Sequence, residues 1–129
     1  MNEPTTGGWT IDSAELREAA SSIGCGLPIS VLFDPEQATS FYSGIKDGQH
    51  QITINGGLRP GVASWTLLHE VAHASQCERM GHVEYAAYTD AAKLRAGGVH
   101  GDGVHEVEAN ALADWLHRRY QPAVKVVQS

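Results

Sequence analysis

The stretch from Asn55 to Gly61, which reads Asn-Gly-Gly-Leu-Arg-Pro-Gly, divides the chain into two parts of different character. Glycine and proline at this density end regular structure on both sides. Before this stretch, apolar and polar residues alternate as they do in strands, after one short helical segment. Beyond it, apolar residues follow helical spacing almost to the end of the chain. Strands gathered in one part and helices in the other predict an α+β fold.

The expected elements follow from local signals. Asp47-Gly48 lies between two alternating segments, which is a strong signal for a β-hairpin and favours a short antiparallel sheet. Gly97–Gly103 is a glycine-rich loop, and the tail after Pro122 forms either a short strand or a frayed end. The predicted elements are a capped helix at 12–23, strands at 27–33, 41–46 and 50–55, and helices at 61–79, 83–96 and 104–120.

Length and charge bound the class of protein. A chain of 129 residues accommodates one domain, which we expect to span residues 11–129 after a flexible leader at 1–10. Asp and Glu number 15 against 9 Lys and Arg, and the formal net charge is −6. Nucleic acids and anionic membranes are bound by clustered cations, so neither is expected as a partner.

Targeting signals and cysteines indicate the compartment. The first ten residues lack the basic and apolar regions of a signal peptide, and no apolar run is long enough to span a membrane. Cys25 and Cys77 are the only cysteines. Without a secretion signal, we expect both as reduced thiols in a cytoplasmic protein.

The run His69-Glu70-Val71-Ala72-His73 carries the chemistry. A spacing of four places the two imidazoles about 40° apart on adjacent helical turns, where they can share one cation. Glu70 points about 60° away from His73, which allows its carboxylate to act on water without binding the metal. Catalytic zinc needs three protein ligands and an open position. The motif therefore predicts one Zn²⁺ ion held by His69 and His73, with Glu70 as the general base.

A third ligand has to come from another element, and the helix at 104–120 supplies two glutamates. Glu108 falls within the predicted buried face of that helix, where a carboxylate is costly unless it is paired or binds a metal. Glu106 lies about 160° away and is expected in solvent. We therefore favour Glu108 as the third ligand, with a buried salt bridge as its alternative role. The predicted buried face comprises Val104, Val107, Ala111, Leu112, Trp115 and Leu116.

The remaining histidines and two tyrosines are weaker candidates. His82 follows a helix end at Gly81 and could turn back toward the metal. Donors beside such a cleft can stabilise an oxyanion or support the ligands, but the same side chains are commonly surface or packing groups. The candidates for this supporting role are His100, His105, Tyr85 and Tyr88. His50 and His117 are expected at the ordinary surface.

Four segments together resemble the gluzincin class of metallopeptidases, and especially the ImmA/IrrE family. They are the strand Ile52–Asn55, a loop with Arg59, the helix Trp65–His73, and the run Glu106–Leu116, which resembles that family's E-x-E-A-N-x-F-A-x-x-L helix. The resemblance implies a small zincin-like fold, in which a short antiparallel sheet packs on the active-site helix and a C-terminal helix bears a glutamate. It also implies that Glu108 is the third zinc ligand.

The function predicted from these features is a zinc metalloendopeptidase that cleaves a protein or peptide. Strand 50–55 directly precedes the active-site helix, and we expect it to form a sheet edge that pairs with an extended substrate through Gln51, Thr53 and Asn55. The alternative is a zinc-binding regulatory or interaction module with little hydrolytic activity. No feature of the sequence indicates an oligomeric state or a particular substrate.

Overall fold

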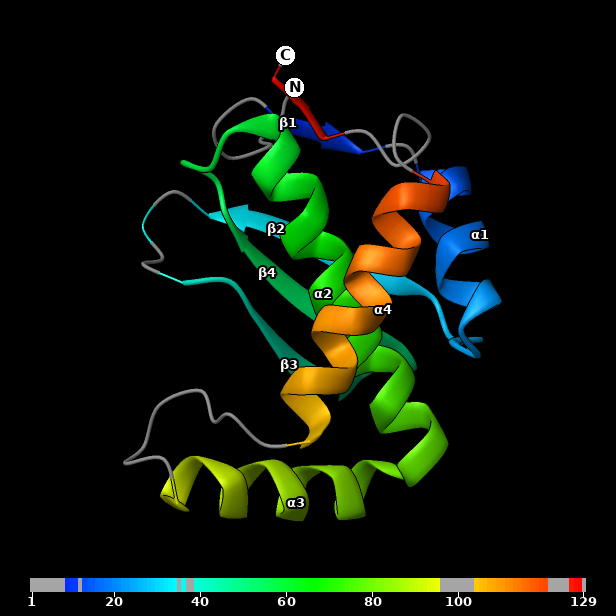
Figure 1. Ribbon diagram of the computed structural model, residues 1–129, viewed down its shortest axis with the longest axis vertical. Helices are drawn as coiled ribbons and strands as arrows, with labels where there is room; N and C mark the ends of the chain where they lie inside the picture. The colour runs from blue at the N-terminus through cyan, green and yellow to red at the C-terminus, as the bar shows by residue number, and fades with distance from the viewer. Residues whose placement is uncertain are drawn as a thin grey trace.

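A computed structural model describes residues 9–11, 13–34, 36, 39–95, 104–120 and 126–128. Within these residues the chain has four helices, a three-stranded sheet and a separate two-stranded sheet, which confirms the α+β class (Figure 1). The elements are β1 (Trp9–Ile11), α1 (Ser13–Ser22), β2 (Ile29–Asp34), β3 (Phe41–Lys46), β4 (Gln49–Asn55), α2 (Pro60–Met80), α3 (His82–Arg95), α4 (Val104–Tyr120) and β5 (Val126–Gln128). The glycine-rich loop at 97–103 lies outside the described residues.

The three-stranded sheet is mixed, and its strand order is β2-β4-β3. β3 and β4 form the predicted hairpin, and Asp47 and Gly48 turn it with φ angles of 54° and 75°. Asp and Gly adopt such left-handed angles more readily than most residues, which explains this turn sequence. β2 pairs with β4 in parallel, so the expectation of a purely antiparallel sheet is wrong. The chain passes through the whole of β3 between these two strands, and this crossover lets them run in the same direction.

β4 is the central strand of this sheet. It is bonded to β2 on one side, from Ile29–His50 to Asp34–Asn55, and to β3 on the other. The prediction that residues 50–55 form a free edge is therefore wrong, because Gln51 and Thr53 are paired with strands on both sides and Asn55 is paired with Asp34 of β2. Ile52 and Ile54 are buried on the face of β4 that packs toward α2. A strand covered on one face and on both edges cannot accept a peptide by strand addition.

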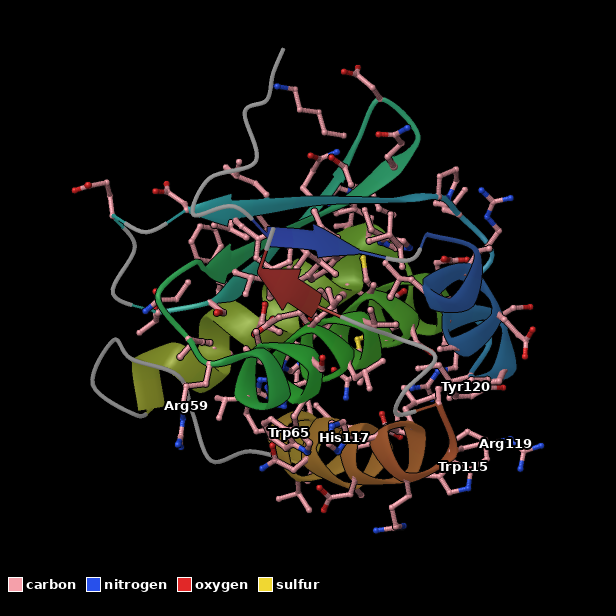
Figure 2. All side chains as sticks on the ribbon, turned by 90° about the horizontal axis from the view of Figure 1, so that it is seen from above. Arg59, Trp65, Trp115, His117, Arg119 and Tyr120 are labelled. Carbon is pink, nitrogen blue, oxygen red and sulfur yellow. The ribbon has the colours of Figure 1, made fainter. Side chains whose placement is uncertain are left out.

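Helix α2 lies between the sheet and α4, so the molecule has three layers (Figure 2). Residues 70–77 of α2 are all buried, and Leu67, Leu68 and Val71 have no exposed surface. A helix that is covered on opposite sides needs small or apolar residues around most of its circumference. α1 flanks the same core, to which it contributes Leu16, Ala19 and Ala20.

Helix α2 ends at Met80, and α3 runs across the lower ends of α2 and α4 (Figure 1). Gly81 makes this sharp turn with a φ of 102°, which favours glycine, and its N–H donates to the carbonyl of Cys77. Among the described helices, none is both long and apolar enough to cross a lipid bilayer.

The two described chain ends meet in a second sheet, where β1 pairs antiparallel with β5 (Figure 1). Trp9 is opposite Gln128, so the tail forms the short strand that the sequence left open. Trp9 and Thr10, which we expected at the end of the flexible leader, belong to strand β1 of this sheet. Residues 1–8 of that expected leader lie outside the described part of the chain.

Candidate metal centre

Three ligand-type atoms from α2 and α4 converge at one point. His69 Nε2, His73 Nε2 and Glu106 Oε1 form a triangle in which each of the three separations is 3.2 Å. A tetrahedral zinc ion with bonds of about 2.0–2.1 Å holds its ligand atoms about 3.3 Å apart. The triangle therefore has the size required by a single zinc ion, and we call these three residues the candidate metal centre.

The hydrogen bonds of Gln76 indicate which nitrogen of His73 faces the centre. The Gln76 amide nitrogen donates to the His105 carbonyl at 2.8 Å and to Glu108 Oε1 at 2.9 Å. Its oxygen therefore faces His73 Nδ1 at 2.8 Å and accepts a proton from it. In a neutral His73, the lone pair is then on Nε2 and points at the candidate metal centre, which is the form that binds metal.

The electrostatics of the centre call for a positive charge. Burial opposes the ionisation of Glu106, but hydrogen bonds from His69 and His73 outweigh burial and hold its pKa well below the ordinary value. Burial also opposes the charged form of His73, but the hydrogen bonds to Glu106 and Gln76 and the charges of Glu70 and Glu106 together outweigh it and raise the pKa of His73. Without metal, a proton must therefore lie among the lone pairs of His69 Nε2, His73 Nε2 and Glu106 Oε1. A divalent cation would serve the same purpose with better geometry.

His69 is held mainly by stacking. The ring of Trp65 lies 5.4 Å from that of His69 at an angle of 26°, and the indole N–H donates to Asp114 Oδ1 at 2.9 Å. Trp65 thus lies between α2 and α4, as Figure 2 shows. Nδ1 of His69 is buried without a hydrogen-bond partner among the described residues. The orientation of this ring therefore depends on Trp65, which Asp114 of α4 holds in place.

Glu70 is buried next to the candidate metal centre. It is only 4% exposed, and no hydrogen bond to a described residue holds its carboxylate. Burial raises the pKa of Glu70, while His73 and His69 partly offset this effect. A buried carboxylate without a partner destabilises a fold, and such groups occur mainly where chemistry requires them.

The structure brings Glu106, and not Glu108, to the two histidines. The side chain of Glu106 is 15% exposed, whereas that of Glu108 is 43% exposed and pairs with Arg79 at 2.9 Å. The structure thus places Glu106 where the sequence favoured Glu108, and the alternative role of Glu108 as an ion-pair partner applies at the surface instead of in the core. Glu108 still reaches the site indirectly, through its bond to Gln76.

The buried face of α4 is not the face that its large apolar residues predict. Val104 is 77% exposed, Val107 is 64% exposed and Trp115 is 41% exposed, although their spacing predicted a buried stripe. The buried face is formed by His105, Ala109, Ala113 and Leu116. The small alanines allow α4 to approach α2 closely, and Glu106 precedes Ala109 by one helical turn. The spacing of Ala109, Ala113 and Leu116 was the signal in the sequence that could have identified Glu106.

The other histidines that the sequence offered as candidates lie in different places. His105 is buried beside the centre, with its ring 5.8 Å from that of His73 and 5.1 Å from that of Tyr88, and its Nε2 lies 3.5 Å from Glu106 Oε2. His82 is exposed and lies near Gly44, and it does not belong to the group of His69, His73 and Glu106. His100 lies outside the described residues.

Tyr85 and His117 also differ from simple surface groups. Burial, and then the charge of Glu70, raise the pKa of Tyr85, whose ring packs edge-on against that of Tyr42 at 5.9 Å. His117 was expected at the surface, but it is only partly exposed, and its Nε2 is buried without a partner among the described residues.

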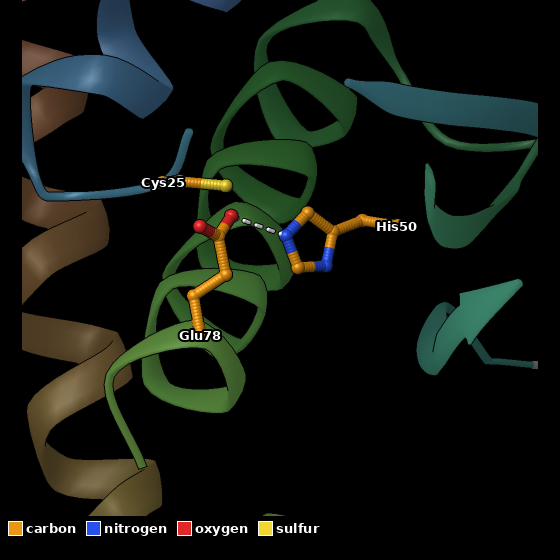
Figure 3. Close-up of side chains that lie close together, drawn as sticks. All are labelled: Cys25, His50 and Glu78. Atoms are coloured by element: carbon orange, nitrogen blue, oxygen red, sulfur yellow. Dashed lines mark hydrogen bonds and ion pairs between the residues drawn. The ribbon is translucent and has the colours of Figure 1, made fainter. Parts of the chain in front are cut away.

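A second group of ligand-type side chains lies in the core, where Cys25, His50 and Glu78 approach within 4.8 Å of one another (Figure 3). The prediction that His50 is a surface residue is wrong, because it is fully buried. Its Nε2 lies 2.6 Å from Glu78 Oε2, and its Nδ1 lies 2.8 Å from the hydroxyl of Tyr42. Glu78 also accepts the backbone N–H groups of residues 26 and 27, both at 3.0 Å.

This second group is a hydrogen-bonded network. The 2.6 Å separation of His50 and Glu78 is a hydrogen-bond distance, and it is shorter than the spacing of about 3.3 Å between zinc ligands. In the metal-free protein, burial raises the pKa of Cys25 to about 12, so its thiol is protonated there. The group of His69, His73 and Glu106 therefore remains the candidate metal centre.

Replacing Glu78 by glutamine is expected to lower the free energy of unfolding at pH 7 by about 3 kcal/mol. Partial burial opposes ionisation of Glu78, but hydrogen bonds from His50 and the backbone of the 26–27 segment lower its pKa from 4.5 to about 2. The ionised carboxylate therefore stabilises the fold fully above pH 4.5, and this contribution is lost as the pH falls toward 2. Urea unfolding at pH 7 and at pH 3 measures it.

The matched control is Glu18→Gln, because Glu18 is an exposed carboxylate on α1. We expect its effect to be small at both pH values. A Glu78→Gln deficit as large at pH 3 as at pH 7 would contradict the assigned ionisation of Glu78.

Comparison with protein-family models, with curated proteins and with solved structures gives no match to this chain.

Proposed function

We propose that the protein is a zinc-dependent metallopeptidase that hydrolyses a bond in a protein or peptide. The observation that carries this proposal is the triangle of His69, His73 and Glu106, with separations of 3.2 Å, beside the buried carboxylate of Glu70, which no described residue bonds. Zinc bound by these three residues would polarise the scissile carbonyl and acidify a water molecule.

The side chains of the protein perform the proton transfers in this proposal. Glu70 takes a proton from the attacking water and delivers it to the leaving amine. Its burial supports this role, because a raised pKa makes the carboxylate a better base than one in solvent. His105 and Tyr88 lie next to the centre on α4 and α3, where their polar atoms are candidates to stabilise the developing oxyanion.

The substrate strand would pair with β3, since β4 is occupied on both sides. Among the described residues, β3 is an outer strand of the sheet and precedes β4 in the hairpin next to α2. An extended peptide that adds to a sheet edge gains main-chain hydrogen bonds that do not depend on its sequence.

A second candidate function is a zinc-binding interaction module, and the outer face of α4 favours it. Val104, Val107 and Trp115 are large apolar side chains that are at least 41% exposed on this helix. Exposed apolar residues gathered on one face are typical of partner-binding surfaces. In this alternative, the metal would fix the position of α4 against α2 without taking part in hydrolysis.

The cysteines support a proposed place of action. Cys25 and Cys77 are both buried free thiols. Reduced cysteines are the ordinary state in the cytoplasm, so we propose that the protein acts there.

Metal removal tests the proposed function. The purified protein is expected to carry about one zinc ion per chain, measured by elemental analysis, and to cleave members of a mixed peptide library. A chelator should abolish cleavage, and added Zn²⁺ should restore it. Bound zinc without any chelator-sensitive cleavage would favour the interaction module instead. A chain that binds no zinc would contradict both functions.

A further inference from the structure

We propose that Gln76 is a positioning residue of the metal centre, and that Glu108 sets its orientation. The two residues form a hydrogen-bonded chain that runs from the surface ion pair with Arg79 to the ring of His73. This proposal rests on the proposed function, because it concerns how His73 presents its Nε2 to the cation.

The Gln76 amide has only one satisfactory orientation. Its neighbours on one side, the His105 carbonyl and the Glu108 carboxylate, are both pure acceptors, so its NH₂ group must face them. If the amide flipped, its oxygen would face two acceptors, and its nitrogen would face His73 Nδ1. Gln76 is only 4% exposed, so little water is available to compensate for such mismatches.

The fixed amide in turn fixes His73. Its oxygen accepts the Nδ1 proton at 2.8 Å, which leaves the lone pair on Nε2 and sets the plane of the ring. Histidines that bind metals usually donate the other N–H to a carboxylate or a carbonyl. Here the amide oxygen takes that place, and the carboxylate of Glu108 acts one residue further from the metal.

Glu108 and Arg79 form the outer end of this chain. Their side chains are 43% and 48% exposed, so the ion pair contributes little to the stability of the fold. Arg79 Nε also donates to Ser75 Oγ at 3.2 Å, which anchors the guanidinium to α2. The pair therefore holds a carboxylate oxygen 2.9 Å from the Gln76 amide without adding much to folding.

The test compares metal binding with folding in three variants. Gln76→Leu keeps the approximate shape of the side chain and removes its hydrogen bonds, and it is expected to weaken zinc binding about 10- to 100-fold. Glu108→Leu should also weaken it, and Glu108→Gln, which retains an acceptor for the amide, should weaken it less than Glu108→Leu. Zinc affinity is measured by competition with a chelating indicator, and the unfolding of the metal-free proteins by urea titration.

A spectroscopic readout separates positioning from a purely structural role. The Co²⁺ absorption bands of fully loaded Gln76→Leu are expected to differ from those of the wild type, because the ring of His73 is no longer held in one plane. Glu18→Leu, an equally large change on the exposed face of α1, should leave affinity and spectrum unaltered. If Gln76→Leu does not fold, the order of the two Glu108 variants decides the question.

Wild-type zinc affinity and an unchanged cobalt spectrum in folded Gln76→Leu would overturn this proposal and leave the metallopeptidase intact. Equal affinities in Glu108→Leu and Glu108→Gln would likewise overturn the role of Glu108. A wild-type protein that binds neither Zn²⁺ nor Co²⁺ would instead overturn the proposed function itself.

Discussion

Replacing Glu70 by glutamine is expected to lower peptide hydrolysis by about 100- to 10,000-fold, which is the usual contribution of a general base. Glutamine has the same shape but cannot take a proton from water. The three residues of the candidate metal centre are untouched, so zinc should remain at about one ion per chain. Turnover of a peptide substrate and elemental analysis of the same preparation measure the two effects together.

Stability provides the control for this variant. Glu70 is a buried carboxylate that no described residue bonds, so its replacement by a neutral amide should leave the free energy of unfolding unchanged or raise it. A loss of activity in a protein of equal or greater stability then reports on chemistry and not on folding. Undiminished cleavage by a zinc-loaded Glu70→Gln protein would show that Glu70 is not the base.

Replacing Glu106 by glutamine is expected to weaken zinc binding by more than about 100-fold, which exceeds the usual effect of losing a supporting residue. The change removes the negative charge that faces His69 and His73 at 3.2 Å, and an amide oxygen is a poorer zinc ligand. Competition with a chelating indicator gives the affinity, and the same titration with Glu108→Gln provides the matched control.

The zinc affinities of the two glutamine variants should therefore differ clearly. Glu106→Gln loses a ligand, whereas Glu108→Gln loses only the charge of a residue whose side chain pairs with Arg79 and Gln76. Both variants lie on α4 and remove one carboxylate, so general electrostatic effects are similar. If Glu108→Gln bound zinc more weakly than Glu106→Gln, the result would support Glu108 as the third ligand, as the sequence predicted.

Helix α4 contributes to the centre in three ways. Glu106 supplies the third ligand-type atom, Glu108 orients Gln76 and through it His73, and Asp114 holds the Trp65 ring that stacks on His69. The motif on α2 is thus incomplete without the packing of α4 against it. Interactions that stabilise this helix pair also hold both histidines in the orientation that the proposed metal requires.

The sequence predicted well those features that depend on neighbouring residues. The helix expected at 104–120 has these bounds, and the one expected at 61–79 spans Pro60–Met80. The Asp47-Gly48 turn and its hairpin are also confirmed. Each depends on caps, breakers or periodicity within a few residues, and such local signals act before any distant contact forms.

The sequence predicted less well those features that depend on distant contacts. The order β2-β4-β3 places β4 at the centre, and nothing within residues 49–55 indicates that β4 also pairs with the earlier strand β2. The sequence around His50 predicts a polar residue in a hairpin strand. In the fold His50 is buried, because Glu78, 28 residues further on, forms a hydrogen bond with its ring. Long-range pairing of this kind is decided by which surfaces meet.

By itself, the sequence determined the spacing of His69 and His73, because an α-helix places residues four apart on adjacent turns whatever packs around it. The packing of α4 in the tertiary structure decided which glutamate joins them. The large apolar residues of α4 predicted one buried face, but close approach to α2 requires small side chains, and the face with Ala109 and Ala113 packs inward. With this face turned inward, Glu106 lies beside the histidines and Glu108 lies at the surface.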